Sequence, residues 1–322
     1  MAAGRPSWRR WRSVDKAPHK LPWGAPVNFL GLPEADTQLA GSHVVILPVP
    51  YEATVSYMGG TRFGPRRILE ASRYIELYDH ELDAEPHTIG VHTLPELLLS
   101  GGGPELALAE LRGAYDTLLE GGKFVIMLGG EHSISAPPIE AHARRLGKKP
   151  LSVLQLDAHG DLRAEYEGTP YSHACVMYRV HRKVKLVPVG IRAITGEERQ
   201  LMRTAKIPTI FAHELDAEER WIERTLQALG PDVYITIDVD FFDPSLVPST
   251  GTPEPGGGTW YATLHLLERV FAERNVVGAD VVELAPIPGL VAPDFFAAKL
   301  VYKLIAYYQR AHAAKRPPKR RR

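Results

Sequence analysis

The sequence predicts an α/β fold in which a single domain is built as a three-layer, doubly wound parallel sheet. Short apolar runs rich in β-branched residues alternate with helical patterns along the chain. These runs are apolar on both faces, as strands are when helices cover both sides of a parallel sheet. Repeated strand-then-helix order is typical of this fold class, and no internal repeat or Pro/Gly/Ser linker divides residues 30–312.

The individual elements follow from the same patterns. We expect strands at the short apolar runs 44–49, 124–128, 151–156, 186–189, 209–212, 233–237 and 276–282. We expect helices over residues 65–78, 105–119, 136–146, 216–229, 263–272 and 293–310. Pro65 suits the first turn of its helix, because the N–H that proline lacks has no helical partner there.

Composition narrows the class of protein. The 322 residues include 38 Lys+Arg and 38 Asp+Glu, so no overall basic field points to a nucleic-acid partner. No apolar run approaches the roughly 18 residues that a membrane helix needs, so we expect no membrane partner. The one cysteine, Cys175, cannot form an intrachain disulfide, which favours a reducing, cytoplasmic setting.

Basic residues gather at both ends of the chain. Residues 1–29 are predicted to be a basic N-terminal extension, and residues 313–322 a solvated basic tail. The start has no apolar segment of the secretory type. A transit peptide, which an Arg-rich and acid-poor start can also indicate, stays open as an alternative.

Polar residues follow four of the expected strands. His132 lies in Gly-Gly-Glu-His-Ser (129–133), and Glu283 follows the strand at 276–282. Asp-Ala-His-Gly-Asp (157–161) and Asp-Val-Asp (238–240) follow two others. Ligands of open α/β sheets bind beyond the carboxyl ends of the strands, so these segments can converge. In extended chain, alternate residues share a side, which places Asp157, His159 and Asp161 together, and likewise Asp238 and Asp240.

Such a cluster calls for cations. Bare carboxylates at close range repel one another, and about four negative charges from the aspartates would be balanced by two divalent ions. Oxygen ligands with two imidazoles and no thiolate suit Mn²⁺ better than structural Zn²⁺. A lone Asp-x-Asp after a strand is commonly a turn or helix cap. The three motifs together, each after a strand, favour metal ligation by His132, Asp157, His159, Asp161, Asp238 and Asp240.

At these motifs the chain resembles the ureohydrolase family, the arginases and agmatinases that cleave guanidino compounds to urea and an amine. The resemblance covers about residues 40–310 and extends from residues 238–244 into Pro-Ser-Thr-Gly-Thr-Pro (248–253) and three glycines at 256–258. It implies an arginase-like fold, a catalytic domain at 30–312, two Mn²⁺ ions per subunit, and a homotrimer or homohexamer.

The resemblance also implies roles for individual residues. One ion would take His132, Asp157, Asp161 and Asp238, and the other Asp157, His159, Asp238 and Asp240. Asp161 would pass a proton to the leaving nitrogen. His173 matches the family's proton-shuttling histidine, and Glu283 matches its glutamate against the guanidinium.

The substrate is expected to be a small cationic guanidino compound. The loop at 163–172 lacks the asparagine with which arginases hold an α-carboxylate, and no aspartate follows Gly-Ile-Arg at 190–192. Glu165 and Glu167 in that loop would repel a carboxylate if they face the site. Agmatine, giving putrescine and urea, is therefore expected first. Aminopropylagmatine, giving spermidine, is the alternative, ahead of guanidino acids and arginine.

Two other interpretations remain. Cys175 could act as a nucleophile with His173 close by, in metal-independent amidine chemistry. The chain could also be a catalytically inactive family member. The first leaves the aspartates unexplained, and the second predicts lost ligands, whereas all six are present.

Overall fold

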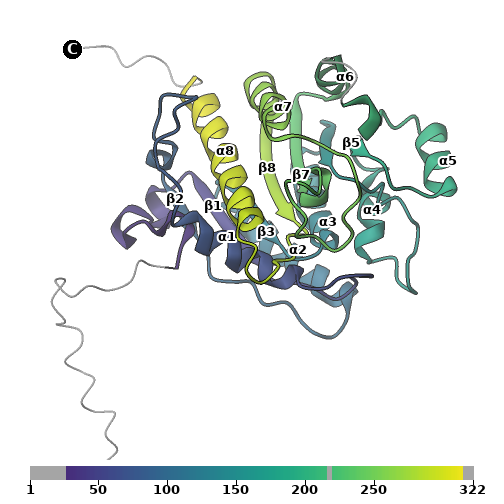
Figure 1. Ribbon diagram of the computed structural model, residues 1–322, viewed down its shortest axis with the longest axis horizontal. Coiled ribbons are helices and arrows are strands. Elements are labelled where there is room, and N and C mark those ends of the chain that lie inside the picture. Colours follow the sequence, from purple (N-terminus) through teal and green to yellow (C-terminus); the bar gives the residue numbers. More distant parts are fainter. Residues whose placement is uncertain (1–26, 216–219, 315–322) are drawn as a thin grey trace, which may run out of the picture.

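The computed structural model describes residues 27–215 and 220–314, and the strands in these ranges form one parallel sheet (Figure 1). The strands are β1 (Val44–Val49), β2 (Val91–Thr93), β3 (Phe124–Gly129), β4 (Leu151–Leu156), β5 (Lys185–Ile191), β6 (Ile210–Phe211), β7 (Asp232–Asp238) and β8 (Asn275–Val282). Their order across the sheet is β2-β1-β3-β8-β7-β4-β5-β6, and every pair is parallel.

Helices cover both faces of this sheet. They are α1 (Gly64–Ser72), α2 (Pro104–Glu120), α3 (Ala136–Leu146), α4 (Val176–Val180), α5 (Gly196–Thr204), α6 (Arg220–Ala228), α7 (Trp260–Glu273) and α8 (Ala292–Ala314). Buried residues of α1, α6, α7 and α8 share one core cluster, and α7 and α8 lie in front of the sheet in Figure 1. Residues of α2, α3, α4 and α5 belong to two clusters on the other face. The predicted three-layer fold is confirmed.

Most predicted elements match to within a few residues, and β1 and β4 match at both ends. The helix expected over 65–78 ends at Ser72, whose hydroxyl donates to the Leu69 carbonyl and accepts from Leu30 N–H. The strand β2 and the helix α4 were missed, because elements of three and five residues show little periodicity. The helix α5 was also missed. A capping box of Thr195 and Glu198 does mark the start of α5 in the sequence.

Parts of three predicted segments lie outside the described residues: 1–26 of the extension, 315–322 of the tail, and 216–219 of the sixth expected helix. Phe29, assigned to the extension, is fully buried in the core. No helix in the described ranges is long and apolar enough to span a bilayer.

The strand order gathers the polar segments. The strands β3, β8, β7 and β4 are immediate neighbours at the centre of the sheet. Adjacent strands lie about 4.8 Å apart, and parallel strands end at the same edge. The four polar segments, far apart in sequence, are thereby brought within three strand spacings of one another.

The loops after β1, β3 and β8 are joined by their backbones at this edge. Glu131 N–H donates to Tyr51 O at 2.9 Å, and Glu283 N–H donates to Gly130 O at 2.9 Å. A Cβ atom on Gly130 would lie 1.7 Å from the Tyr51 carbonyl oxygen. Only glycine permits this close approach, which explains one of the two glycines before His132.

We therefore expect Gly130→Ala to lower the free energy of unfolding by about 3 kcal/mol or more, because the Tyr51 carbonyl cannot withdraw without losing its hydrogen bond. Gly113→Ala is the matched control, since Gly113 lies in α2 with open space around its Cα. It should stabilise the protein by about 0.5–1 kcal/mol. Urea-induced equilibrium unfolding measures both. Equal effects of the two substitutions would refute the close-approach argument.

Candidate metal centre

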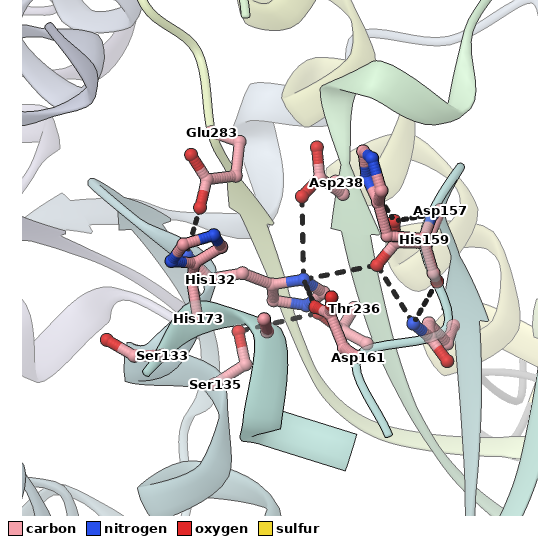
Figure 2. Close-up of polar contacts among 12 residues, drawn as sticks. His132, Ser133, Ser135, Asp157, His159, Asp161, His173, Thr236, Asp238 and Glu283 are labelled. Atoms are coloured by element: carbon pink, nitrogen blue, oxygen red, sulfur yellow. Dashed lines mark hydrogen bonds and ion pairs between the residues drawn. The ribbon is translucent and has the colours of Figure 1, made fainter. Parts of the chain in front are cut away.

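One imidazole and three carboxylates meet at the ends of three strands. His132 follows β3, Asp157 and Asp161 follow β4, and Asp238 is the last residue of β7. His132 Nδ1 lies 3.2 Å from Asp157 Oδ2, 3.0 Å from Asp161 Oδ2 and 3.5 Å from Asp238 Oδ2 (Figure 2). This nitrogen is buried and has no hydrogen-bond partner among the described residues. A buried ring nitrogen facing three carboxylates suits a shared cation.

A second group adjoins the first. His159 Nδ1 lies 2.8 Å from Asp240 Oδ2 and 3.8 Å from Asp157 Oδ1. Ligand atoms of His132, Asp157 and Asp238 lie within 4.8 Å of one another, as do those of Asp157, His159 and Asp240. The two groups share Asp157, so the residues present could hold two adjacent divalent ions.

Turns bring these side chains together, and the expected extended chain does not. The strand β4 ends at Leu156, and Asp161 has a left-handed backbone with φ 52°. Asp157 Oδ1 accepts from His159 N–H at 2.7 Å, and Asp238 Oδ1 accepts from Asp240 N–H at 2.9 Å. An aspartate that bonds the backbone two residues on forms a tight turn. In each of these two segments, the carboxylate of the first aspartate therefore stabilises the turn that follows it.

Burial and charge perturb the titration of the aspartates. Burial raises the pKa of Asp157, and the charges of Asp161 and Asp240 raise it further. Burial also raises the pKa of Asp238 well above its usual value, reinforced by Asp240 and Asp157. Without a cation, the folded chain therefore favours protons on these carboxylates.

Burial lowers the pKa of a histidine, whereas it raises the pKa of an aspartate, but neighbouring carboxylates outweigh burial at both histidines here. Burial by itself lowers the pKa of His132, but the adjacent carboxylates of Asp157 and Asp161 raise it well above its ordinary value. For His159, burial is likewise outweighed by the charge and hydrogen bond of Asp240, which raise its pKa to about 10. In the metal-free chain, protons on these histidines and carboxylates balance the charge that cations would otherwise balance. The oxygen-rich donor set fits hard or borderline divalent ions.

Glu283 and His173 lie at the same cleft. Glu283 follows β8 with φ 65°, and its Oε1 accepts from His132 N–H at 2.6 Å. Burial raises the pKa of Glu283 well above its usual range. His173 begins a short 3-10 helix that Ser172 caps by accepting from Ala174 N–H. The structure therefore brings together all eight predicted site residues.

Sequence reasoning missed the residues that hold His173. Glu131 is fully buried and accepts from Thr54 N–H at 2.6 Å and from Thr54 Oγ1 at 2.7 Å. Thr54 Oγ1 in turn accepts from His173 N–H at 3.0 Å and lies 3.3 Å from His173 Nδ1. Glu131 stands beside His132 in the quoted motif, whereas nothing in the sequence singles out Thr54.

The cleft walls come from loops. Residues 55–58 form one wall, and residues 250–252 form another. Glu165 and Glu167 are exposed and are not among the lining residues. The condition under which they would repel a carboxylate is therefore not met, and Tyr166 of this loop is the residue that packs against His173, with ring centroids 6.0 Å apart.

Cys175 does not fit the thiolate interpretation. Its side chain is fully buried and is not among the residues that line the cleft. Burial raises the pKa of its thiol to about 11, and the charge of Asp161 adds to the rise. A thiol with a raised pKa is a poor nucleophile at neutral pH.

Fold and site together define a protein of the three-layer α/β class with a candidate two-metal centre at the carboxyl edge of its sheet. The Arginase family model matches residues 42–306. The N(1)-aminopropylagmatine ureohydrolase of Synechocystis is 42% identical over 299 residues, which cover 91% of this chain and 97% of that protein. The agmatinase of Bacillus anthracis is 37% identical over 253 residues, covering 76% and 84%.

A solved structure shows the same likeness. The agmatine ureohydrolase of Thermoplasma volcanium superposes with a TM-score of 0.78 at 28% identity, covering 86% of this chain and 93% of that one. The chain belongs to the Arginase family, and the predicted ureohydrolase resemblance is confirmed.

The pKa directions predict how stability of the metal-free protein depends on pH. Folding raises the pKa of His159 from 6.5 to about 10, so the folded chain keeps a proton that the unfolded chain releases. The contribution of this proton to stability is complete below the pKa of the unfolded chain, and it is lost as pH rises through the pKa of the folded chain. Raised carboxyl pKa values act in the same direction from about pH 4 upward.

We expect the denaturation midpoint of metal-free protein to fall between about pH 6 and pH 9, and stabilisation by added Mn²⁺ to grow, because cations replace the protons. His159→Gln should show a smaller fall with pH. Chemical denaturation in the presence of a chelator measures the metal-free pH profiles of the wild type and His159→Gln, and denaturation with added Mn²⁺ measures the stabilisation by the ion. Parallel pH profiles for the wild type and His159→Gln would contradict the prediction.

Proposed function

We propose that the protein is a binuclear manganese hydrolase that cleaves the guanidino group of aminopropylagmatine to release urea and spermidine, with agmatine as a second substrate. The observation that carries this proposal is the pair of ligand groups joined by Asp157 in a cleft that Glu283 also lines. Identity to the Synechocystis relative, 42% across 97% of its length, favours the longer substrate over agmatine, which the sequence alone favoured.

We assign the first ion to His132, Asp157, Asp161 and Asp238, and the second to Asp157, His159, Asp238 and Asp240. The distances to His132 Nδ1 support the first set, and those to His159 Nδ1 support Asp157 and Asp240 in the second. Six ligands with four carboxylates and no thiolate support Mn²⁺. Divalent ions bound in such a pair supply a water nucleophile at neutral pH.

The chain's own residues orient the substrate and move protons. Glu283 Oε1 is fixed by His132 N–H, which leaves the carboxylate aimed into the cleft to pair with the planar guanidinium. Cleavage breaks the bond between the guanidinium carbon and the substrate nitrogen, which must gain a proton to leave as an amine. Asp161 lines the cleft beside His132 and can carry that proton from the attacking water.

His173 exchanges protons with solvent in this scheme. The Thr54 hydroxyl donates to Glu131 at 2.7 Å, so toward the His173 ring it can only accept. The Ser172 hydroxyl lies farther from Nδ1, at 3.4 Å, so we infer that Nδ1 of His173 donates to Thr54 and that Nε2 is left for exchange. An imidazole held in this way, half-buried at the cleft, is suited to a proton shuttle.

The cleft lining supports a substrate without a carboxylate. None of the described lining residues is Lys or Arg, and the walls away from the ligands consist of Val55, Ser56, Tyr57, Met58, Thr250, Gly251 and Thr252. The carboxylate of arginine or guanidinobutyrate would lose hydration without gaining a cationic partner. We also propose a catalytic domain at 30–312, a homotrimer or homohexamer, and a cytoplasmic location, in keeping with the single cysteine.

Urea release from Mn²⁺-loaded protein tests the substrate proposal. We expect kcat/KM for aminopropylagmatine to exceed that for agmatine, and both to exceed arginine and guanidinobutyrate by about a hundredfold or more. Chelator dialysis should abolish release, and Mn²⁺ should restore it. A preference for agmatine would correct only the length of the substrate. A preference for arginine would overturn the argument from the cleft lining.

Cys175→Ser should retain most of the activity, because the buried thiol lies outside the cleft. Asp157→Asn is the contrasting variant, since Asp157 belongs to both ligand groups. It should lose bound metal and at least about a thousandfold in kcat. Elemental analysis and urea release measure both variants. A thousandfold loss in Cys175→Ser with its metal retained would revive the thiolate mechanism.

A further inference from the structure

A chain of buried, hydrogen-bonded side chains leads from the Nε2 atom of His132 into the sheet. His132 Nε2 lies 2.8 Å from Thr236 Oγ1 (Figure 2). Thr236 Oγ1 in turn lies 2.6 Å from Asp280 Oδ1. Thr236 and Asp280 are fully buried, and His132 is 1% exposed. Neither Thr236 nor Asp280 belongs to the proposed ligand set, and no other part of the mechanism uses them.

Two adjacent strands hold the members of this hydrogen-bonded chain in fixed positions. Thr236 on β7 and Asp280 on β8 are paired residues in the sheet. Tyr234, two residues before Thr236 and on the same side of β7, donates its hydroxyl to Asp280 Oδ2 at 2.8 Å. Gly278 leaves room for the tyrosine, because a Cβ there would lie 3.0 Å from the Tyr234 ring.

Hydrogen-bond direction follows from the donors and acceptors present. The Thr236 hydroxyl has one proton and three possible acceptors: the Asp280 carboxylate at 2.6 Å, His132 Nε2 at 2.8 Å and Ser135 Oγ at 3.4 Å. The short bond to a carboxylate is much the stronger, so the proton points to Asp280. Toward His132, Thr236 can then only accept, which requires the hydrogen of the neutral ring to be on Nε2.

The tautomer decides whether His132 can bind metal. With the hydrogen on Nε2, the Nδ1 lone pair is free and faces Asp157, Asp161 and Asp238. In the other tautomer, an N–H would occupy the ligand position. No water can substitute for a missing partner here, because every member of the chain is fully or almost fully buried.

We propose that Thr236 and Asp280 are positioning residues that fix the tautomer and orientation of His132, and that Tyr234 holds the Asp280 carboxylate in place. This inference rests on the proposed metal centre. Histidine ligands are commonly fixed by a hydrogen bond at the second ring nitrogen, and losing it weakens metal binding about 10- to 100-fold.

Mn²⁺ titration of metal-free protein, followed by calorimetry and by electron paramagnetic resonance of bound ion, tests the proposal. Thr236→Val keeps the shape of the side chain but removes the hydroxyl, and should weaken binding at one position by about 10- to 100-fold. Thr236→Ser restores the hydroxyl and should bind within about threefold of the wild type. Thr225→Val is the matched control, since the fully buried Thr225 hydroxyl bonds only the Trp221 carbonyl. It should bind Mn²⁺ as the wild type does.

Tyr234→Phe keeps the test decisive if Thr236→Val does not fold. It removes one donor to Asp280 far from the ligands and should weaken binding by about threefold to tenfold. Wild-type affinity in a folded Thr236→Val, or failure of Thr236→Ser to restore binding, would overturn the proposal. So would wild-type affinity in Tyr234→Phe when Thr236→Val is unfolded. Failure of the wild type itself to bind two Mn²⁺ would instead refute the proposed metal centre, so the two failures are distinguishable.

Discussion

Buried negative charge at the carboxyl edge of the sheet is the constraint on which the rest of the site depends. Asp157, Asp161, Asp238, Asp240 and Glu283 are all buried there. Carboxylates removed from water need protons or cations, and the raised pKa values of Asp157 and Asp238 show that protons serve when no cation is present. The carboxylates are close together because β3, β8, β7 and β4 are neighbours in the sheet. The two histidines add nitrogen atoms to them and complete the candidate ligand set.

The sequence was sufficient to predict those parts of the fold and site that depend on local pattern. Apolar runs located seven of the eight strands, and motifs at the strand ends located the candidate ligands. Contacts between residues far apart in the sequence could not be predicted from local pattern. Thr54 meets Glu131 across 77 positions, and His132 meets Thr236 across 104. Whether Glu165 and Glu167 face the site could not be predicted, because a loop's side-chain directions depend on tertiary packing, which local pattern does not contain.

Catalytic chemistry and substrate choice depend on different parts of the structure. The candidate ligands lie at strand ends fixed by many backbone bonds, and Arg192 reinforces one of them by donating to the carbonyls of Asp240 at 2.7 Å and Glu254 at 2.9 Å. The cleft walls at 55–58 and 250–252 are loops instead. Loops tolerate change more readily than strands, so substrate length can vary among relatives while the metal ligands stay in place. Relatives named for aminopropylagmatine and for agmatine, at 42% and 37% identity, are consistent with this division.

The same hydrogen-bond device occurs twice around this centre. The Thr54 hydroxyl donates its hydrogen bond to Glu131, and the Thr236 hydroxyl donates its hydrogen bond to Asp280. Each threonine is thereby left as an acceptor for one histidine ring, His173 in the first case and His132 in the second. The outcome is opposite at the two rings, because Thr54 faces Nδ1 and Thr236 faces Nε2. In the proposed mechanism Nε2 of His173 exchanges protons, whereas Nδ1 of His132 binds metal. Two buried carboxylates outside the proposed ligand set would thereby determine which histidine nitrogen serves each task.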